Sequence, residues 1–205
     1  MRLWGRGSDA QRIAAFWEWW AEHRVDVVLA AEAGEAGLPR LAAMFDPAVA
    51  RMGDVGWEFG LGERLPWQLA MSPGHRALLP LTVAWVDAAP SDEAVEFLPA
   101  KPRRPGGVSG ARVVLPDGRD VDLGELRCAV SSSIAEGVVD LRVYHPEFPS
   151  MSDEAQYWLS FMALDVELGE FRVMTATYVI EPVTQASPDM IPITDLRSVI
   201  DSHRR

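Results

Sequence analysis

The stretch Val55-Gly56-Trp57-Glu58-Phe59-Gly60-Leu61 alternates large apolar side chains with small or polar ones. This period of two predicts a strand with one buried face, because successive side chains of a strand point to opposite sides of the sheet. Three further elements follow: a strand over 67–71, a helix that begins near Pro80 and runs to about residue 88, and a strand over 95–98. Residues 55–98 therefore predict the order strand, strand, helix, strand.

The same order recurs in the second half of the chain. Residues 126–180 predict strands over 126–131 and 138–144, a helix that begins after Ser152, and a strand over 171–180 rich in β-branched residues. The expected buried stripe of that helix consists of Tyr157, Phe161, Leu164 and Leu168. The predicted fold class is α+β, with two ββαβ-like units that lie side by side or share one mostly antiparallel sheet. In the alternative, the chain is a single α+β domain whose apparent repeat is accidental.

Two helices are expected before the first unit and one at the C-terminal end. The first contains Phe16-Trp17-Glu18-Trp19-Trp20, in which Phe16, Trp17 and Trp20 share one helical face with Ile13. That face is expected in the core, whereas Trp19 points away from it and is a candidate contact residue. The second helix spans about residues 38–52, with Pro47 expected to bend or break it. The last covers roughly residues 194–203.

A basic stretch rich in proline and glycine, residues 101–107, is the best candidate for a linker. We expect a single α+β domain over residues 1–205, and this stretch offers a subdivision into 1–100 and 108–205. A solvated linker is favoured over the alternative, in which Arg103 and Arg104 bind an anion. Beyond it, Pro116-Asp117-Gly118 separates two short apolar runs and predicts a β-hairpin.

The composition is that of a globular, acidic chain. Its net charge is −11, and residues 111–205 carry 8 basic and 16 acidic side chains. This balance argues against nucleic acid as a partner, because binding to phosphates requires a basic surface. It suits a basic protein partner, although ordinary acidic solubility is the simpler explanation.

Cysteine content and hydropathy indicate where such a chain works. Cys128 is the only cysteine, so no intramolecular disulfide can form and a reducing compartment is expected. The apolar runs are too short to span a bilayer, and the first residues lack the apolar segment of a signal peptide. We therefore expect a soluble, cytoplasmic protein without a membrane partner.

Three motifs occur in order along the chain. They are Phe16-Trp17-x-Trp19-Trp20; Val86-x-x-Ala89-Pro90 followed by Phe97-x-x-x-Lys101-Pro102; and Leu164-Asp165-x-x-Leu168-Gly169-Glu170. Together they resemble an uncharacterised family of bacterial proteins over most of the chain. No activity is assigned to that family, so the resemblance implies an intact bacterial domain and transfers no catalytic residue.

Signatures of common catalytic sites are missing from the sequence. It has no Walker-type phosphate loop, no dinucleotide-binding glycine motif and no Gly-x-Ser-x-Gly elbow, and neither a zinc site nor a cofactor is expected. The strongest candidate site combines Asp165, Glu167 and Glu170, whose carboxylates could hold a hard cation or act as acid and base. A capped turn, with Gly169 in a left-handed conformation and Glu170 bonded to nearby backbone, is the favoured explanation.

Three functions remain open. The favoured one is an acidic protein-interaction module, of inhibitor or immunity type, that binds a basic partner through Trp19 and the carboxylates Asp165, Glu167 and Glu170. The second is a small enzyme with a carboxylate-based, metal-assisted site. The third is a structural or scaffold protein that forms a homo-oligomer through a sheet edge.

Overall fold

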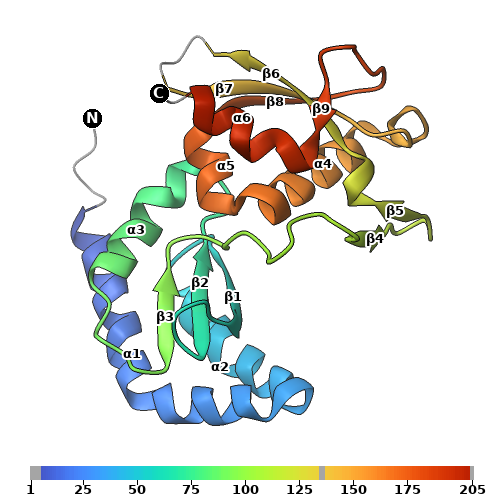
Figure 1. Ribbon diagram of the computed structural model, residues 1–205. Coiled ribbons are helices and arrows are strands. Elements are labelled where there is room, and N and C mark those ends of the chain that lie inside the picture. Colours follow the sequence, from blue (N-terminus) through green and yellow to red (C-terminus); the bar gives the residue numbers. More distant parts are fainter. Residues whose placement is uncertain (1–5, 134–136, 204–205) are drawn as a thin grey trace. The chain divides into compact units, whose positions relative to one another are not determined.

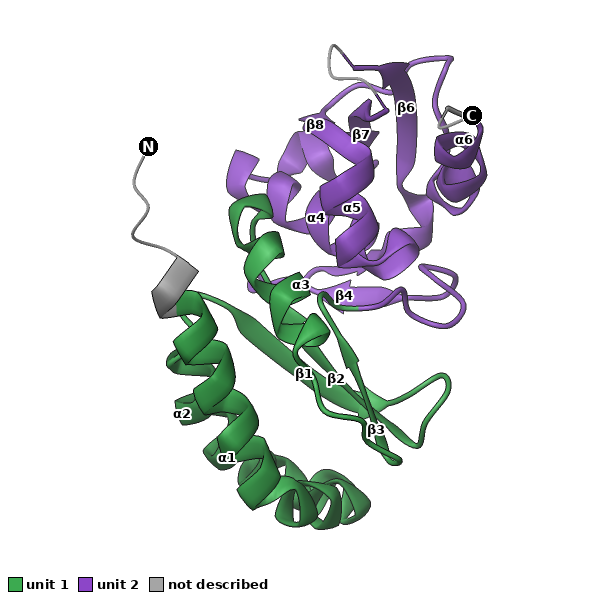
Figure 2. Cartoon of the chain, turned by 90° about the vertical axis from the view of Figure 1, so that its left-hand side faces the viewer, with its two compact units in different colours: residues 1–101 green, residues 102–205 purple. Residues whose placement is uncertain are grey.

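A computed structural model of the protein describes residues 6–133 and 137–203 (Figure 1). The chain divides into two compact units, residues 1–101 and 102–205, which we call unit 1 and unit 2 (Figure 2). Each unit has its own sheet and its own hydrophobic core. The α+β class expected from the sequence is confirmed.

Unit 1 begins with two helices and continues as a ββαβ unit. Its elements are α1 (Arg6–Glu32), α2 (Leu38–Ala50), β1 (Gly56–Leu61), β2 (Trp67–Ser72), α3 (Leu79–Asp87) and β3 (Val95–Leu98). β1 pairs with β2 in antiparallel fashion, and β3 returns beside β2 in parallel, so that Trp67 lies opposite Val95. The period-two stretch of the sequence therefore forms the predicted strand, β1, which lies at an edge of the sheet. Its residues are partly buried or exposed, so the predicted alternation of a buried and an exposed face is not found.

Unit 2 repeats this arrangement after a short hairpin. Its elements are β4 (Arg112–Val114), β5 (Asp120–Asp122), β6 (Arg127–Ser132), β7 (Val139–Tyr144), α4 (Asp153–Leu168), α5 (Glu170–Ala176), β8 (Thr177–Val183), β9 (Ile191–Pro192) and α6 (Leu196–His203). The main sheet has the order β8-β7-β6-β9, and β8 runs parallel to β7 while the other pairs are antiparallel. Both halves of the chain thus contain the predicted ββαβ order, each with its own sheet.

Two local predictions need correction. Pro47 was expected to bend or break the second helix, and the break is absent: α2 continues to Ala50, because Phe45 and Val49 on either side of the proline are buried in the core of unit 1. That packing outweighs the single backbone hydrogen bond that proline removes. The segment after Gly169 is also not a strand from residue 171 onward, since α5 occupies residues 170–176 and β8 begins only at Thr177.

The second error has a clear physical cause. Gly169 has a positive φ of 84°, which lets the chain leave α4 and start a new helix at once. The backbone N–H groups of Arg172 and Val173 donate to the Gly169 carbonyl, and Val173 and Ala176 are buried three residues apart. Helical burial therefore outweighs the β propensity of this segment.

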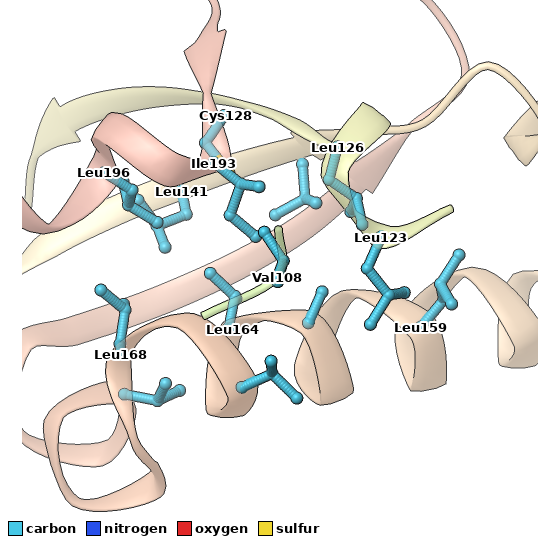
Figure 3. Close-up of a cluster of buried hydrophobic side chains, with 14 of the residues drawn as sticks. Val108, Leu123, Leu126, Cys128, Leu141, Leu159, Leu164, Leu168, Ile193 and Leu196 are labelled. Atoms are coloured by element: carbon cyan, nitrogen blue, oxygen red, sulfur yellow. The ribbon is translucent and has the colours of Figure 1, made fainter. Parts of the chain in front are cut away.

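The two cores differ in chemistry. In unit 1 the core is aromatic: Trp85 stacks on Trp17 with ring centroids 4.8 Å apart, and Trp20 and Phe45 are fully buried. In unit 2 the core is aliphatic, with leucines of α4 facing Cys128 and Leu141 of the sheet (Figure 3).

A membrane-spanning helix would need a long apolar run. Among the described residues, no helix is both long enough and apolar enough to cross a bilayer.

Candidate functional site

Trp19, the first predicted contact residue, packs within unit 1. Its indole stacks on the imidazole of His23 with ring centroids 5.0 Å apart. It also contacts Phe16 and Phe45 at 5.4 and 5.5 Å. Trp19 is therefore only partly exposed and belongs to the edge of the aromatic core.

Glu167, a predicted site residue, is buried and holds the proposed linker in place. Its carboxylate accepts hydrogen bonds from Arg103 Nη2 at 2.9 Å and from the Val108 backbone N–H at 3.0 Å. Arg103 Nε donates to the Glu167 carbonyl at 2.6 Å, and the Arg104 N–H donates to the Val166 carbonyl at 3.1 Å. The segment 103–108 is therefore bound along the end of α4 rather than free in solvent.

Gly107 shows how closely this segment approaches the carboxylate. Its φ is +61°, and a Cβ atom placed there would overlap the Glu167 carboxylate and the Arg103 guanidinium. A side chain at this position would therefore push the segment off Glu167.

The other two predicted carboxylates lie near the junction of α4 and α5. Asp165 is partly buried, and its backbone carbonyl accepts the N–H of Gly169 at 2.9 Å. Glu170 is buried at the start of α5. Across residues 6–133 and 137–203, no three histidine, cysteine, aspartate or glutamate side chains converge as a set of metal ligands.

The buried stripe of α4 is rotated relative to the prediction. Leu164 and Leu168 are buried as expected, but Tyr157 and Phe161 are 46% and 43% exposed. The buried face instead includes three polar side chains, those of Gln156, Ser160 and Glu167. The prediction that Tyr157 and Phe161 belong to the core is therefore wrong.

Each buried polar side chain of α4 has hydrogen-bond partners. Gln156 Nε2 donates to the carbonyls of Phe148 and Met151, at 3.0 and 3.1 Å. Ser160 Oγ donates to the carbonyl of Gln156 at 2.8 Å. Because these groups are satisfied, their burial costs little, and the aromatic side chains are left on the outer face.

The outer face of α4 carries three exposed aromatic rings, which we call the aromatic ridge: Tyr157, Trp158 and Phe161. Trp158 is the most exposed of them at 48%. At about 100° per residue these three positions fall within an arc of about 100° around the helix axis, so their side chains project from one broad face. Glu154, one turn before Trp158, projects from the same face and is exposed.

A hollow lies on one flank of the ridge, between α4 and the β4–β5 hairpin. We call it the hairpin hollow; its volume is about 840 Å³. Its walls are formed by Val114, Leu115, Pro116, Asp117, Arg119, Ser150, Ser152, Glu154, Ala155 and Trp158. The predicted hairpin and the predicted N-cap both contribute to it, since Ser152 Oγ accepts the N–H of Ala155 at 3.3 Å.

A second hollow, of about 620 Å³, lies on the other flank and is more polar. It is lined by Arg142, Asp153, Gln156, Tyr157 and residues 181–187 that end and follow β8. Arg142 Nη2 is paired with Asp189 at 2.9 Å. Trp158 therefore lines the hairpin hollow, whereas Tyr157 lines the second hollow.

The charges around the ridge are unevenly paired. The guanidinium of Arg119 bonds to the carboxylate of Asp117 at 2.6 Å and to Ser150 Oγ at 2.6 Å, and lies 3.9 Å from Glu147. The hydrogen bonds from Arg119 hold the pKa of Asp117 below its ordinary value. Asp153 and Glu154 form no ion pair with any described residue. The ridge therefore has a surplus of negative charge.

Comparison with known proteins adds no relative. No family model, no curated protein and no solved structure matches the chain.

Proposed function

We propose that the protein is an acidic protein-interaction module that binds a basic partner through the aromatic ridge of α4. The exposure of Tyr157, Trp158 and Phe161 on one helical face carries this proposal. The proposed contact surface differs from the one expected from the sequence, because Trp19 packs at the edge of the aromatic core and Glu167 is buried.

Aromatic side chains are the usual anchors of protein interfaces, because a rigid ring buries a large area at a small entropic cost. Each of the three rings keeps 43–48% of its surface exposed, and these exposed parts lie on neighbouring positions of one helix. The two hollows beside the ridge could accept side chains of a partner that contacts the rings. These features support a contact surface rather than a helix face that is merely solvated.

The choice of a basic partner rests on charge. Asp153 and Glu154 are exposed at the start of α4 and unpaired, and the whole chain carries a net charge of −11. Complementary charge would speed the encounter and make its rate fall as salt is added.

A capture experiment tests the proposal. The protein is immobilised and exposed to a lysate of the organism that encodes it, in parallel with the double variant Tyr157→Ala/Phe161→Ala. The matched control is Tyr178→Ala/Phe171→Ala, which removes the same two ring types from exposed positions of unit 2 outside the ridge. The partner should bind the wild type and the control, and bind the ridge variant about tenfold or more weakly.

Two measurements on the purified partner complete the test. Its association rate should fall with ionic strength, and its binding should slow amide exchange in α4. Equal capture by the ridge variant, or a partner that protects no part of α4, would refute the proposal.

A further inference from the structure

We propose that the hairpin hollow binds an arginine side chain of the partner, stacked on the indole of Trp158 and paired with the carboxylate of Glu154. The inference rests on the proposed function for the source of the arginine and specifies the chemistry that the ridge recognises. It predicts a partner segment in which an arginine is flanked by apolar residues.

The walls of the hollow suit such a segment. Four apolar residues line the hollow: Val114, Leu115, Pro116 and Ala155. Trp158 adds a partly exposed ring. Guanidinium groups stack favourably on indole rings, and their carbon stems pack on apolar walls. The volume of about 840 Å³ falls within the range of about 300–1,000 Å³ found for ligand pockets.

The charges of the hollow decide between a cation and an anion. Among the described residues, Arg119 is the one cation that lines the hollow, and it is already bonded to Asp117 and Ser150 and lies near Glu147. Glu154 keeps an unpaired carboxylate on the rim. An anion would therefore meet a saturated guanidinium and a repelling carboxylate, whereas a guanidinium would find both a free carboxylate and a ring.

The test uses short blocked peptides with the full-length protein. One peptide carries a central arginine between leucines; in the others citrulline or glutamate replaces it. Citrulline keeps the shape of arginine and removes its charge. Binding is followed by NMR through the indole N–H signal of Trp158, which is assigned as the signal absent from the Trp158→Ala variant.

The arginine peptide should shift the Trp158 signal and bind about tenfold more tightly than the citrulline peptide. The variant Glu154→Gln should weaken its binding several-fold. The control Glu181→Gln changes the net charge equally, but its position lines the second hollow, so binding should stay close to that of the wild type. Far-UV circular dichroism checks that all variants remain folded.

Three outcomes would overturn the inference: equal binding of the arginine and citrulline peptides, preferred binding of the glutamate peptide, or an equal effect of the two glutamate substitutions. The peptide test is independent of the capture experiment. A partner that needs Tyr157 and Phe161 while the arginine peptide fails would refute the arginine site and leave the proposed function intact. If the arginine peptide binds at Trp158 but no partner depends on the ridge, the arginine site stands and the proposed function is refuted.

Discussion

Unit 1 and unit 2 share the ββαβ order but differ in how far their aromatic side chains are buried. Every described aromatic side chain of unit 1 is buried or partly buried. In the described part of unit 2, Phe148 is buried and Tyr144 is partly buried, whereas the three rings of the ridge, Phe171 and Tyr178 are each at least 43% exposed. Topology alone therefore does not determine which residue type fills the core.

The difference follows from how the helices and the sheet pack in each unit. In unit 1 three strands pack with three helices, and large rings fill the space among them, as in the stack of Trp17 on Trp85. In unit 2 the helix α4 buries leucine and alanine together with polar groups that are hydrogen-bonded locally. An exposed ring in unit 2 thus contributes little to stability, which makes the comparison testable.

The largest expected effect is the difference in stability between two separate tryptophan-to-alanine variants, one in each unit. Trp20→Ala removes a side chain that is 1% exposed and should lower the free energy of unfolding by about 3–5 kcal/mol. Trp158→Ala should change it by no more than about 0.5 kcal/mol. Urea unfolding followed by far-UV circular dichroism measures both. A comparable loss in Trp158→Ala would mean that the ridge is part of a core.

The next effect concerns the buried carboxylate of unit 2. Glu167→Ala should cost about 2–3 kcal/mol, because the buried N–H of Val108 loses its acceptor and Arg103 loses its ion pair. Glu154→Ala, an exposed position on the same helix, is the control and should cost about 0.5 kcal/mol. Chemical denaturation of the two variants gives the comparison, and equal losses would show that the bound segment 103–108 is dispensable.

A smaller effect is expected at Trp19. Its ring is only partly buried against Phe16 and Phe45, so Trp19→Ala should lower the free energy of unfolding by about 1–2 kcal/mol. It should leave partner binding unchanged, in contrast to substitutions in the ridge. Thermal unfolding and the capture assay test the two statements, and a stable variant that has lost its partner would restore Trp19 as a contact residue.

The smallest effect is a pH dependence in unit 1. Burial tends to raise the pKa of Glu96, but hydrogen bonds from Arg64 and the Glu63 N–H outweigh it and hold that pKa below its usual value. A lowered pKa stabilises the fold above the ordinary carboxylate range, near pH 4, and the contribution is lost as the pH falls through the lowered value.

Glu96→Gln should therefore cost about 1 kcal/mol at neutral pH and progressively less in acid. Unfolding curves of the wild type and the variant at a series of pH values measure this difference. A gap that stays constant into acid would contradict the assigned role of the carboxylate.

The sequence predicted the order of elements well where a local signal determined them. The period-two run at β1, the Pro116-Asp117-Gly118 turn and the Ser152 cap act through nearby backbone, and all three are present. The break at Pro47 and the strand after Gly169 did not form, because distant packing overrode local propensity.

The candidate site was harder to predict for a related reason. Tyr157 and Phe161 have the spacing of a buried stripe, but the buried face of α4 contains Gln156 and Ser160, whose burial is made cheap by their hydrogen bonds. Those bonds involve partners that no periodicity search weighs. The polar residues at positions 156, 160 and 167 share one helical face, and that spacing was the available signal.

The segregation of side chains also equips each half of the chain with its own spectroscopic or chemical reporter. Seven of the eight tryptophans lie within residues 1–101, so tryptophan fluorescence reports mainly on unit 1, and the Trp158→Ala variant makes it report on unit 1 alone. Cys128 is buried in unit 2, and burial raises the pKa of its thiol to about 12. The thiol therefore stays protonated and shielded from reagents until unit 2 opens. A single denaturation series read by fluorescence and by thiol labelling follows the two halves separately, without any engineered probe.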